Sequence, residues 1–587
     1  MRRALPPQVV PLLAALTLSH LTGCTGQIGD GDSEPPPGTA PGAFVCTPGD
    51  PSPTVLPRLS RAQYASSLEA LAVAALGADE GAAVVGATAG ALQILPEDSD
   101  PDHARLDQSV AQAHVDAQYG VALAFASAMT ATPERVGALV GDCGTDADPA
   151  NDAACIDDFI RALGARAHRR PVSDAELAFY RDEVYQPAAG IDPLAIRDVI
   201  TVMVLSPWFL YRVENEGAPV DGRDDLFELS GYELAARLSF HFWNAPPDDA
   251  LLAAAESGEL ATSDGYAAQV DRMLDDPRAQ ATIDRFFAEW FLLDDLAPLH
   301  QSVGTPAYDD FVGADVPTPE LRDRVIEDAL DLVRYTTFAT DGTLDDLFLS
   351  ERSFAKTADV AALYGGVPLW SEGAEPPTFP AGARAGILTR IALLATGSTL
   401  THPILRGRDI RERGICEDLP APPANAMNDA TAVDPAASER TKMTAQTEQP
   451  GSSCAGCHAR LNPIGYTLEG YDGLGRARTE ERVYGADGSL LATWPIDSTS
   501  VPRIVPAQEE PASNGTDLSR LVVESEMPQS CFARHYFRFT FGRAEDDEVD
   551  GCALEDMREK LLEGASIRDV LRTLAMDPTF RRRKLAD

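Results

Sequence analysis

Residues 454–478 read CAGCHARLNPIGYTLEGYDGLGRAR, and this stretch opens with a CxxCH motif. Thiols at positions i and i+3 lie on one side of a helical turn, so Cys454 and Cys457 can form thioethers with the two vinyl groups of a haem. His458 then presents its imidazole to the iron as the proximal ligand. A chain with this cysteine and histidine content is expected to contain about 0.002 such motifs by chance. The motif therefore predicts one covalently attached haem c, held by Cys454, Cys457 and His458.

The motif has two other interpretations, a redox dithiol and part of a zinc site. A thioredoxin-like dithiol requires a βαβ setting, and a zinc site requires further ligands; the sequence nearby indicates neither. The sequence does not identify the sixth ligand of the haem iron. An open position would indicate small-molecule chemistry, whereas a thioether or imidazole ligand would indicate electron transfer. The candidates for that ligand are Met427, Met443, Met527, His402, His535 or none.

The first residues resemble the signal of an exported lipoprotein. Arg2 and Arg3 precede an apolar run, residues 9–21, which is too short to span a bilayer. The run ends at Leu21-Thr22-Gly23-Cys24, which resembles a bacterial lipobox, so we expect Cys24 to carry the lipid. The signal and the lipobox predict a location in the cell envelope, facing the periplasm or the cell surface. Residue 25 is Thr and not Asp, which resembles the outer-membrane address of Gram-negative lipoproteins, so the outer membrane is favoured. The alternative is an ordinary cleaved signal peptide.

Nine cysteines are present, and three are assigned to the lipid and the haem. Six remain, an even number that suits disulfides in an oxidising compartment. Two pairs are close in sequence, and the third follows by elimination, although six cysteines allow fifteen connectivities. The predicted pairs are Cys143 with Cys155, Cys531 with Cys552, and Cys46 with Cys416.

The composition limits the class of protein. The chain has 587 residues, of which 44% are hydrophobic, so it can build several cores. Its net charge of −43 repels phosphate backbones, which argues against nucleic acid as a partner. Sequences typical of hydrolases with a nucleophilic serine, of zincins and of nucleotide-binding loops are absent from it, and no catalytic residues are assigned.

The fold class predicted from periodicity is mainly α: several packed helical domains, a C-terminal cytochrome-c-like haem region, and one short β-hairpin. Ser173/Glu176 and Ser230/Glu233 fit the capping box that begins a helix. The hairpin is expected within residues 483–496. Loops are expected at residues 371–381 and 420–452, which are rich in Pro, Gly or polar residues. Two helical segments are expected within 264–293, on either side of Asp276-Pro277. Further helices are expected at 60–76, 156–168, 194–206, 319–338, 385–395, 403–415, 517–525, 530–541, 554–562 and 567–575.

The segment from Cys454 to Arg478 resembles the haem region of a bacterial secreted family made of serial domains of unknown function, numbered in the fifteen-eighties and fifteen-nineties. The family pattern continues after CxxCH as DPxGFxLExFDxxGxxR, and this chain has Asn462 where the pattern has Asp. Glu469 and Asp472 fit the pattern and are expected to accept hydrogen bonds from Arg478 or Arg476. Stretches in the same order resemble the other domains: RLSRAQYASSLEALA (58–72), RAHRRPVSDAELAFY (166–180), LSGYELAARLSFHFW (229–243) and CFARHYFRFTFGR (531–543).

The resemblance and the composition together divide the chain into seven parts. The divisions are a lipoprotein signal (1–24), a disordered tether (25–55), an N-terminal helical domain (56–150), a second helical domain (151–220), a central helical domain (221–370), a helical region leading into the haem motif (371–480) and a C-terminal helical domain (481–587).

Three functions fit these features. The first is an exported haem c protein, anchored to the membrane by lipid, that takes part in one-electron transfer with a redox partner protein. The second is a binding or scaffold protein of the cell envelope, in which the haem is structural or sensory. Binding of a polymer or a carbohydrate is compatible with this function, but no sequence feature supports it. The third is a haem redox enzyme with an open iron site.

Overall fold

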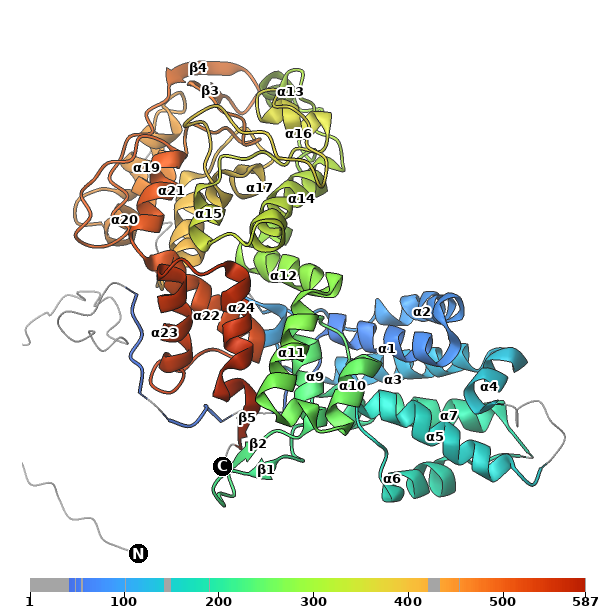
Figure 1. Cartoon of the computed structure of the whole chain (residues 1–587). Helices are drawn as coiled ribbons and strands as arrows, with labels where there is room; N and C mark the ends of the chain where they lie inside the picture. The colour runs from blue at the N-terminus through green and yellow to red at the C-terminus, as the bar shows by residue number, and fades with distance from the viewer. Residues whose placement is uncertain are drawn as a thin grey trace, which may run out of the picture.

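The computed structural model describes residues 42–585 except 48, 54–55, 101, 142–148, 189, 421–432 and 453. The predicted lipid attachment at Cys24, the signal and most of the tether therefore lie outside the described residues. None of the helices in the described ranges has the length and apolarity that a bilayer span requires. The chain is mainly α-helical, which confirms the predicted fold class (Figure 1).

The N-terminal helices form an arm that extends from the centre of the molecule (Figure 1). Their buried residues, from Leu59 to Phe209, pack into one hydrophobic cluster that Phe240 joins. The helices start where the sequence predicts caps, as at Ser173, whose hydroxyl accepts from the amide of Glu176. The elements of the arm are α1 (Arg61–Leu76), α2 (Ala78–Leu92), η1 (Ala104–Leu106), α3 (Gln112–Met129), α4 (Pro133–Val140), α5 (Asp152–His168), α6 (Asp174–Ala178), η3 (Phe179–Val184), α7 (Pro193–Val204) and α8 (Pro207–Leu210).

The central part combines residues from the middle of the chain with residues from its C-terminal end. Tyr266 on α11 donates a hydrogen bond to the carbonyl of Ala575 on α24 over 2.8 Å. A small antiparallel sheet has the order β1-β2-β5, so the last strand pairs with a strand more than 350 residues earlier in the chain. The elements are β1 (Ala218–Pro219), β2 (Leu226–Glu228), α9 (Gly231–Phe242), α10 (Asp249–Glu256), η4 (Glu259–Ala261), α11 (Ser263–Leu274), α12 (Pro277–Trp290), η5 (Leu293–Asp295), α22 (Met527–Phe541), α23 (Gly551–Leu562), α24 (Ile567–Met576), η10 (Pro578–Arg581) and β5 (Arg582–Lys584).

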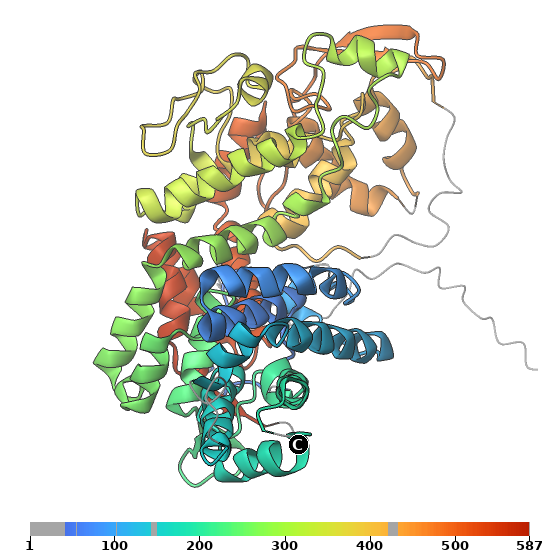
Figure 2. The same cartoon turned by 90° about the vertical axis from the view of Figure 1, so that its right-hand side faces the viewer.

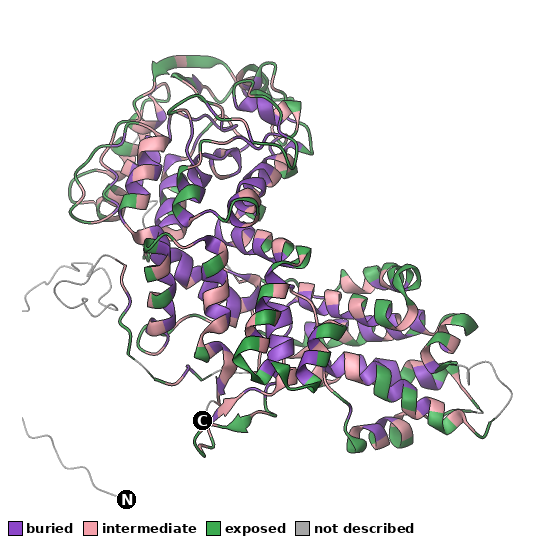
Figure 3. Ribbon diagram, in the orientation of Figure 1, coloured by how far each residue is buried: buried purple, intermediate pink, exposed green. Residues whose placement is uncertain are grey.

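The remaining elements form an upper part that holds the CxxCH segment, and the view turned by 90° shows it above the arm (Figures 1 and 2). It shares one hydrophobic cluster with the central part. Its buried positions face its own interior as well as the centre, and they include residues of α13 and α16, whereas strand β4 is exposed (Figure 3). The elements are α13 (Pro306–Val312), α14 (Leu321–Arg334), η6 (Tyr335–Ala339), α15 (Leu344–Leu349), α16 (Ala358–Leu363), η7 (Ile387–Thr389), α17 (Ile391–Leu394), α18 (Pro403–Asp409), η8 (Ile410–Gly414), α19 (Glu439–Thr447), α20 (Ala455–Thr467), β3 (Glu480–Tyr484), β4 (Leu490–Pro495) and α21 (Gly515–Glu524).

Local predictions agree with most of these elements, do not locate several others, including the long helices α2 and α3, and are wrong at two places. The hairpin β3–β4 is antiparallel and confirms the prediction at residues 483–496. The predicted helix at 385–395 is wrong: it is two short turns, η7 and α17, separated at Arg390, whose backbone is extended. The predicted loop at 420–452 is wrong over α19, which begins at Glu439. Its N-cap is Ser438, whose side chain accepts from the amide of Thr441.

Two of the predicted disulfide pairs are wrong. The structure joins Cys46 to Cys552 and Cys416 to Cys531. The helices α22 and α23 run antiparallel, since Arg558 near the end of α23 bonds Ser530 near the start of α22. Cys531 therefore lies beside Arg558, about 9 Å along the helix axis from Cys552. Cys155 is also disulfide-bonded, and its predicted partner Cys143 lies outside the described residues.

Candidate haem-attachment site

The CxxCH residues occupy the first turn of α20. Cys454 is the cap residue before the helix, and Cys457 and His458 lie within its first turn. Both thiols are free and partly exposed, although every other described cysteine is in a disulfide. Two unoxidised thiols on one helical turn, reachable from solvent, meet the covalent requirement for attachment of a haem.

The ring of His458 is held by Asn462, one helical turn further along α20. His458 Nδ1 lies 3.1 Å from Asn462 Oδ1. The amide nitrogen of Asn462 lies 2.7 Å from a carboxylate oxygen of Glu448, which accepts from it, and 2.9 Å from the hydroxyl of Thr447. This orientation leaves Asn462 Oδ1 as an acceptor, so His458 Nδ1 carries the proton and its Nε2 keeps the lone pair that an iron ligand needs.

Sequence reasoning noted Asn462 only as a departure from the family pattern and missed its role. Its position four residues after His458 places it on the same helical face, and this spacing was the available signal. Thr447 and Glu448 belong to the segment predicted as a loop. They could not be assigned without knowing that α19 packs against α20, where Thr444 and Tyr466 are joined by a hydrogen bond of 2.9 Å between their hydroxyls.

A buried polar network supports the other end of α20. The carboxylate of Glu469 accepts from Thr401 over 2.6 Å and from Arg478 over 2.9 Å. The carboxylate of Asp472 accepts from Arg476 over 2.8 Å. These contacts confirm the predicted hydrogen bonds and give Glu469 and Asp472 a structural role.

Helix α18 crosses α20 at very short range. A Cβ atom at Gly465 would lie 1.9 Å from the carbonyl oxygen of Pro403, and one at Gly407 would lie 2.1 Å from that of Leu461. Arg406 on α18 is fully buried and donates to the carbonyl groups of Leu468, Tyr471 and Asp472 at 2.9 to 3.0 Å. Its burial lowers its pKa to about 10. The crossing fixes α20 in place against the core.

A cavity of about 320 Å³ runs beside α18. Its lining is largely apolar, with Leu296, Leu388 and Leu405, and includes His402. His402 has a left-handed backbone, with φ at 51°. Burial, followed by the charge of Arg406, lowers the pKa of its imidazole. The cavity is a place for a small molecule close to the helix pair that carries the CxxCH motif.

The candidate sixth ligands lie at different places. Met427 lies outside the described residues. Met443 lies on α19 beside Thr444, which contacts Tyr466, two helical turns along α20 from His458. His402 precedes Pro403, which packs on Gly465. Met527 begins α22, and His535 lies within that helix, where its ring contacts His103. The predicted haem residues are thus brought together, and the described candidates for the sixth ligand are dispersed.

Three family models match the chain in series. Residues 155–214 match PSD5, a protein of unknown function (DUF1595). Residues 229–365 match PSD4, a protein of unknown function (DUF1592). Residues 384–481, which include the CxxCH segment, match PSCyt3, a protein of unknown function (DUF1588). No curated protein and no solved structure matches the chain.

Proposed function

Because the chain belongs to the multidomain family that joins these domains of unknown function in series, and its CxxCH residues meet the requirements for haem attachment, we propose that it is an exported, lipid-anchored haem c protein that transfers single electrons in the cell envelope. The observation that carries the proposal is the pair of free thiols on one turn of α20 beside a histidine whose Nε2 keeps its lone pair. When bound, the haem would supply a one-electron Fe(III)/Fe(II) couple.

The residues around the motif would set the properties of that couple. Asn462 holds the His458 ring at one angle and accepts its Nδ1 proton, which makes the imidazole a stronger donor. Glu448 and Thr447 fix Asn462 in turn. A ligand ring held rigidly in both redox states suits electron transfer, because little has to move when the charge changes.

The expected location has independent support from the cysteines. The described chain holds two long-range disulfides, Cys46–Cys552 and Cys416–Cys531. Such bonds persist in oxidising compartments such as the periplasm and the cell surface. This supports the interpretation of residues 1–24 as an export signal with a lipidated Cys24. A soluble redox protein is the proposed partner, and the charge of −43 favours one with a basic face.

Optical spectra of protein produced with the cytochrome c maturation system test the proposal. We expect a reduced-minus-oxidised spectrum of a six-coordinate haem c, no change with CO, and reversible cycling with a periplasmic electron carrier. Reversible binding to an envelope polymer with no redox-linked change would instead indicate a scaffold with a structural haem.

A haem redox enzyme with an open iron is the second candidate, and the cavity beside α18 is the observation that favours it. It predicts that CO shifts the ferrous spectrum. The variant Leu405→Trp, which adds bulk to the cavity lining at an exposed position, would then slow turnover of a small substrate and leave the haem spectrum unchanged. A ferrous protein that does not bind CO excludes this candidate.

A further inference from the structure

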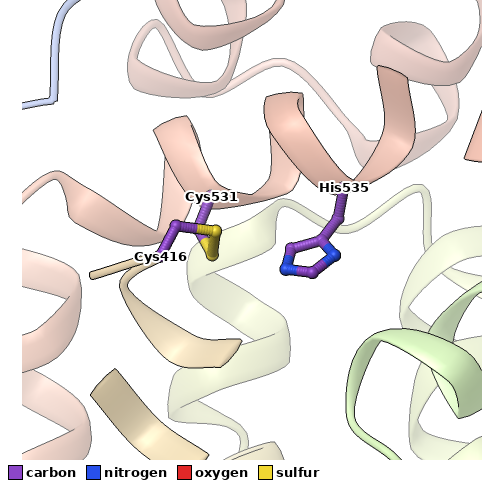
Figure 4. Close-up of side chains that lie close together, drawn as sticks. All are labelled: Cys416, Cys531 and His535. Carbon is purple, nitrogen blue, oxygen red and sulfur yellow. A yellow bond between two sulfur atoms is a disulfide. The ribbon is translucent and has the colours of Figure 1, made fainter. Parts of the chain in front are cut away.

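A second group of chemically active side chains lies away from the CxxCH motif. It consists of Cys416, which follows η8, and of Cys531 and His535 on α22. Each residue offers one sulfur or nitrogen atom, and these three atoms lie within 4.8 Å of one another. In the described part of the chain this is the one group of three or more histidine, cysteine or acidic residues with such spacing. Figure 4 shows that the two cysteines form a disulfide and that one edge of the His535 ring faces it.

The ring of His535 is almost completely buried, with 1% of its surface exposed. Its Nδ1 lies 3.1 Å from Nε2 of His103, and Nδ1 of His103 lies 3.2 Å from the carboxylate of Glu289. Its Nε2 has no hydrogen-bond partner among the described residues. A buried polar atom without a partner is costly and calls for a functional explanation.

The chain of contacts fixes which nitrogen of His535 carries the proton. Burial alone would raise the pKa of Glu289, but the hydrogen bond from His103 and the charge of Arg285 outweigh it and lower that pKa, so the carboxylate is ionised and only accepts. Since an ionised carboxylate only accepts, Nδ1 of His103 donates to Glu289, and Nδ1 of His535 donates to Nε2 of His103. The Nε2 of His535 is therefore a bare lone pair. A carboxylate behind a histidine is the outer-shell arrangement typical of metal-binding histidines.

The surrounding charges are compatible with a metal ion that is neutralised by two thiolates. Burial lowers the pKa of His535 well below its usual range, and His103, Arg538, Arg413 and Arg534 act in the same direction. The nearby guanidinium groups have their own carboxylates, since Asp102 contacts Arg413 and Arg538 at 2.7 and 2.8 Å. A doubly charged cation with two thiolates and a neutral imidazole adds no net charge to this buried place.

We propose that Cys416, Cys531 and His535 form a redox-gated zinc site, which the Cys416–Cys531 disulfide closes and its reduction opens. Two thiolates and one imidazole are ligands that Zn²⁺ prefers, and three protein ligands leave one position open to an exogenous ligand. A dithiol reductant supplies two electrons and two protons, breaks the S–S bond to give two thiols, and is itself oxidised to a disulfide. Binding of Zn²⁺ then releases the two thiol protons, and His535 binds through Nε2.

Cobalt binding tests the site with a spectroscopic readout. The chain with Cys454→Ala/Cys457→Ala is used, so that the thiols of the CxxCH motif cannot contribute and the result does not depend on the haem. After reduction with a phosphine, we expect one equivalent of Co²⁺ to give thiolate-to-cobalt charge-transfer absorption and tetrahedral d–d bands, which Zn²⁺ abolishes. The oxidised protein should show none. Cys416→Ser/Cys531→Ser should lose the bands, whereas Cys46→Ser/Cys552→Ser, which removes the other described disulfide, should keep them.

His103→Ala tests the outer shell, and a 10- to 100-fold weaker affinity is expected. A second measurement requires no substitution in the site. In the reduced chain, Zn²⁺ should protect Cys416 and Cys531 from alkylation, as read by mass spectrometry, and leave Cys46 and Cys552 reactive as internal controls. Reduced protein that binds no Co²⁺, bands that persist in Cys416→Ser/Cys531→Ser, or equal alkylation of all four thiols with and without Zn²⁺ would overturn the proposal.

Discussion

Two histidines in this protein are oriented by a partner on Nδ1 that leaves Nε2 as a lone pair. For His458 the partner is the amide oxygen of Asn462, and for His535 it is the ring of His103. The first lies beside two free thiols and the second beside a disulfide. For each histidine, the partner of Nδ1 sets the direction and the basicity of Nε2, so it affects ligand binding at that imidazole as much as the neighbouring cysteines do.

Asn462→Ala tests the first of these arrangements. Loss of the acceptor makes the His458 imidazole a weaker donor, so the ferric haem is less stabilised and the reduction potential rises, by about 60 mV for a tenfold change in the equilibrium. The matched control is Thr447→Val, which removes one hydrogen bond from Asn462 and keeps its contact with His458. Potentiometric titration measures both, and an unchanged potential in Asn462→Ala would rule out the role of Asn462.

The elements that carry the haem motif depend on close backbone contact. The α18–α20 crossing needs glycine at 407 and 465, because any side chain there would meet a carbonyl group of the facing helix. Periodicity predicts α18, within residues 403–415, and the CxxCH motif predicts only the first turn of α20. The sequence contains no signal for which glycines form the contact. Capping boxes, in contrast, are local, so Ser173/Glu176 and Ser230/Glu233 could be identified from sequence and are present.

Gly465→Ala is expected to destabilise the protein by about 1–3 kcal/mol, because its Cβ would overlap the Pro403 carbonyl and push α18 away. Gly470→Ala is the control, since nothing lies within 4 Å of a Cβ at that position, and a change within about 0.5 kcal/mol is expected. Chemical denaturation followed by circular dichroism gives both values. Equal stability of the two variants would show that the crossing tolerates a side chain.

Helices α12 and α14 are joined by a pair whose stability depends on pH. Arg334 donates to Asp284 over 2.7 Å, but burial raises the pKa of Asp284 from 3.8 to about 6. At a pH between these two pKa values, Asp284 holds its proton in the folded state and loses it in the unfolded state. The contribution of Asp284 to stability therefore falls as pH rises from about 4 to about 6.

Asp284→Asn removes that titration. The unfolding free energy of the variant minus that of the unchanged protein should increase by about 1–2 kcal/mol as pH rises from 4 to 6. Denaturation curves of the two proteins across this range measure the difference. A difference that is constant with pH, or one that moves in the other direction, would contradict the assignment of the raised pKa to Asp284.

At the scale of the whole molecule, the two ends of the described chain are fastened together. Cys46 is bonded to Cys552, the amide of Phe44 donates to Glu555 over 2.8 Å, and Pro53 forms an isolated β-bridge with Lys584. Sequence reasoning gave the mainly α class and most helix positions, because these follow from local periodicity. It could not give the disulfide pairing, because pairing depends on the antiparallel packing of α22 and α23 and on where residues 42–53 run.

Cys46→Ser/Cys552→Ser should lower the unfolding free energy by about 2–5 kcal/mol, because the crosslink closes most of the chain into one loop. Ser52→Ala is the local control; it removes a contact of 3.4 Å to Asp550 and keeps the disulfide. Thermal unfolding without reductant should show a lower midpoint for the double variant alone. A double variant as stable as the unchanged protein would show that the ends are held by noncovalent contacts.

The central claim is that Cys454 and Cys457 hold a haem covalently. The most direct measurement is the intact mass of the protein produced with the cytochrome c maturation system, with a pyridine haemochrome spectrum on the same sample. We expect a mass increase of one haem and a c-type spectrum, both of which survive denaturation and vanish in Cys454→Ala/Cys457→Ala. A chain of unmodified mass, or haem that is removed by denaturation, would contradict it.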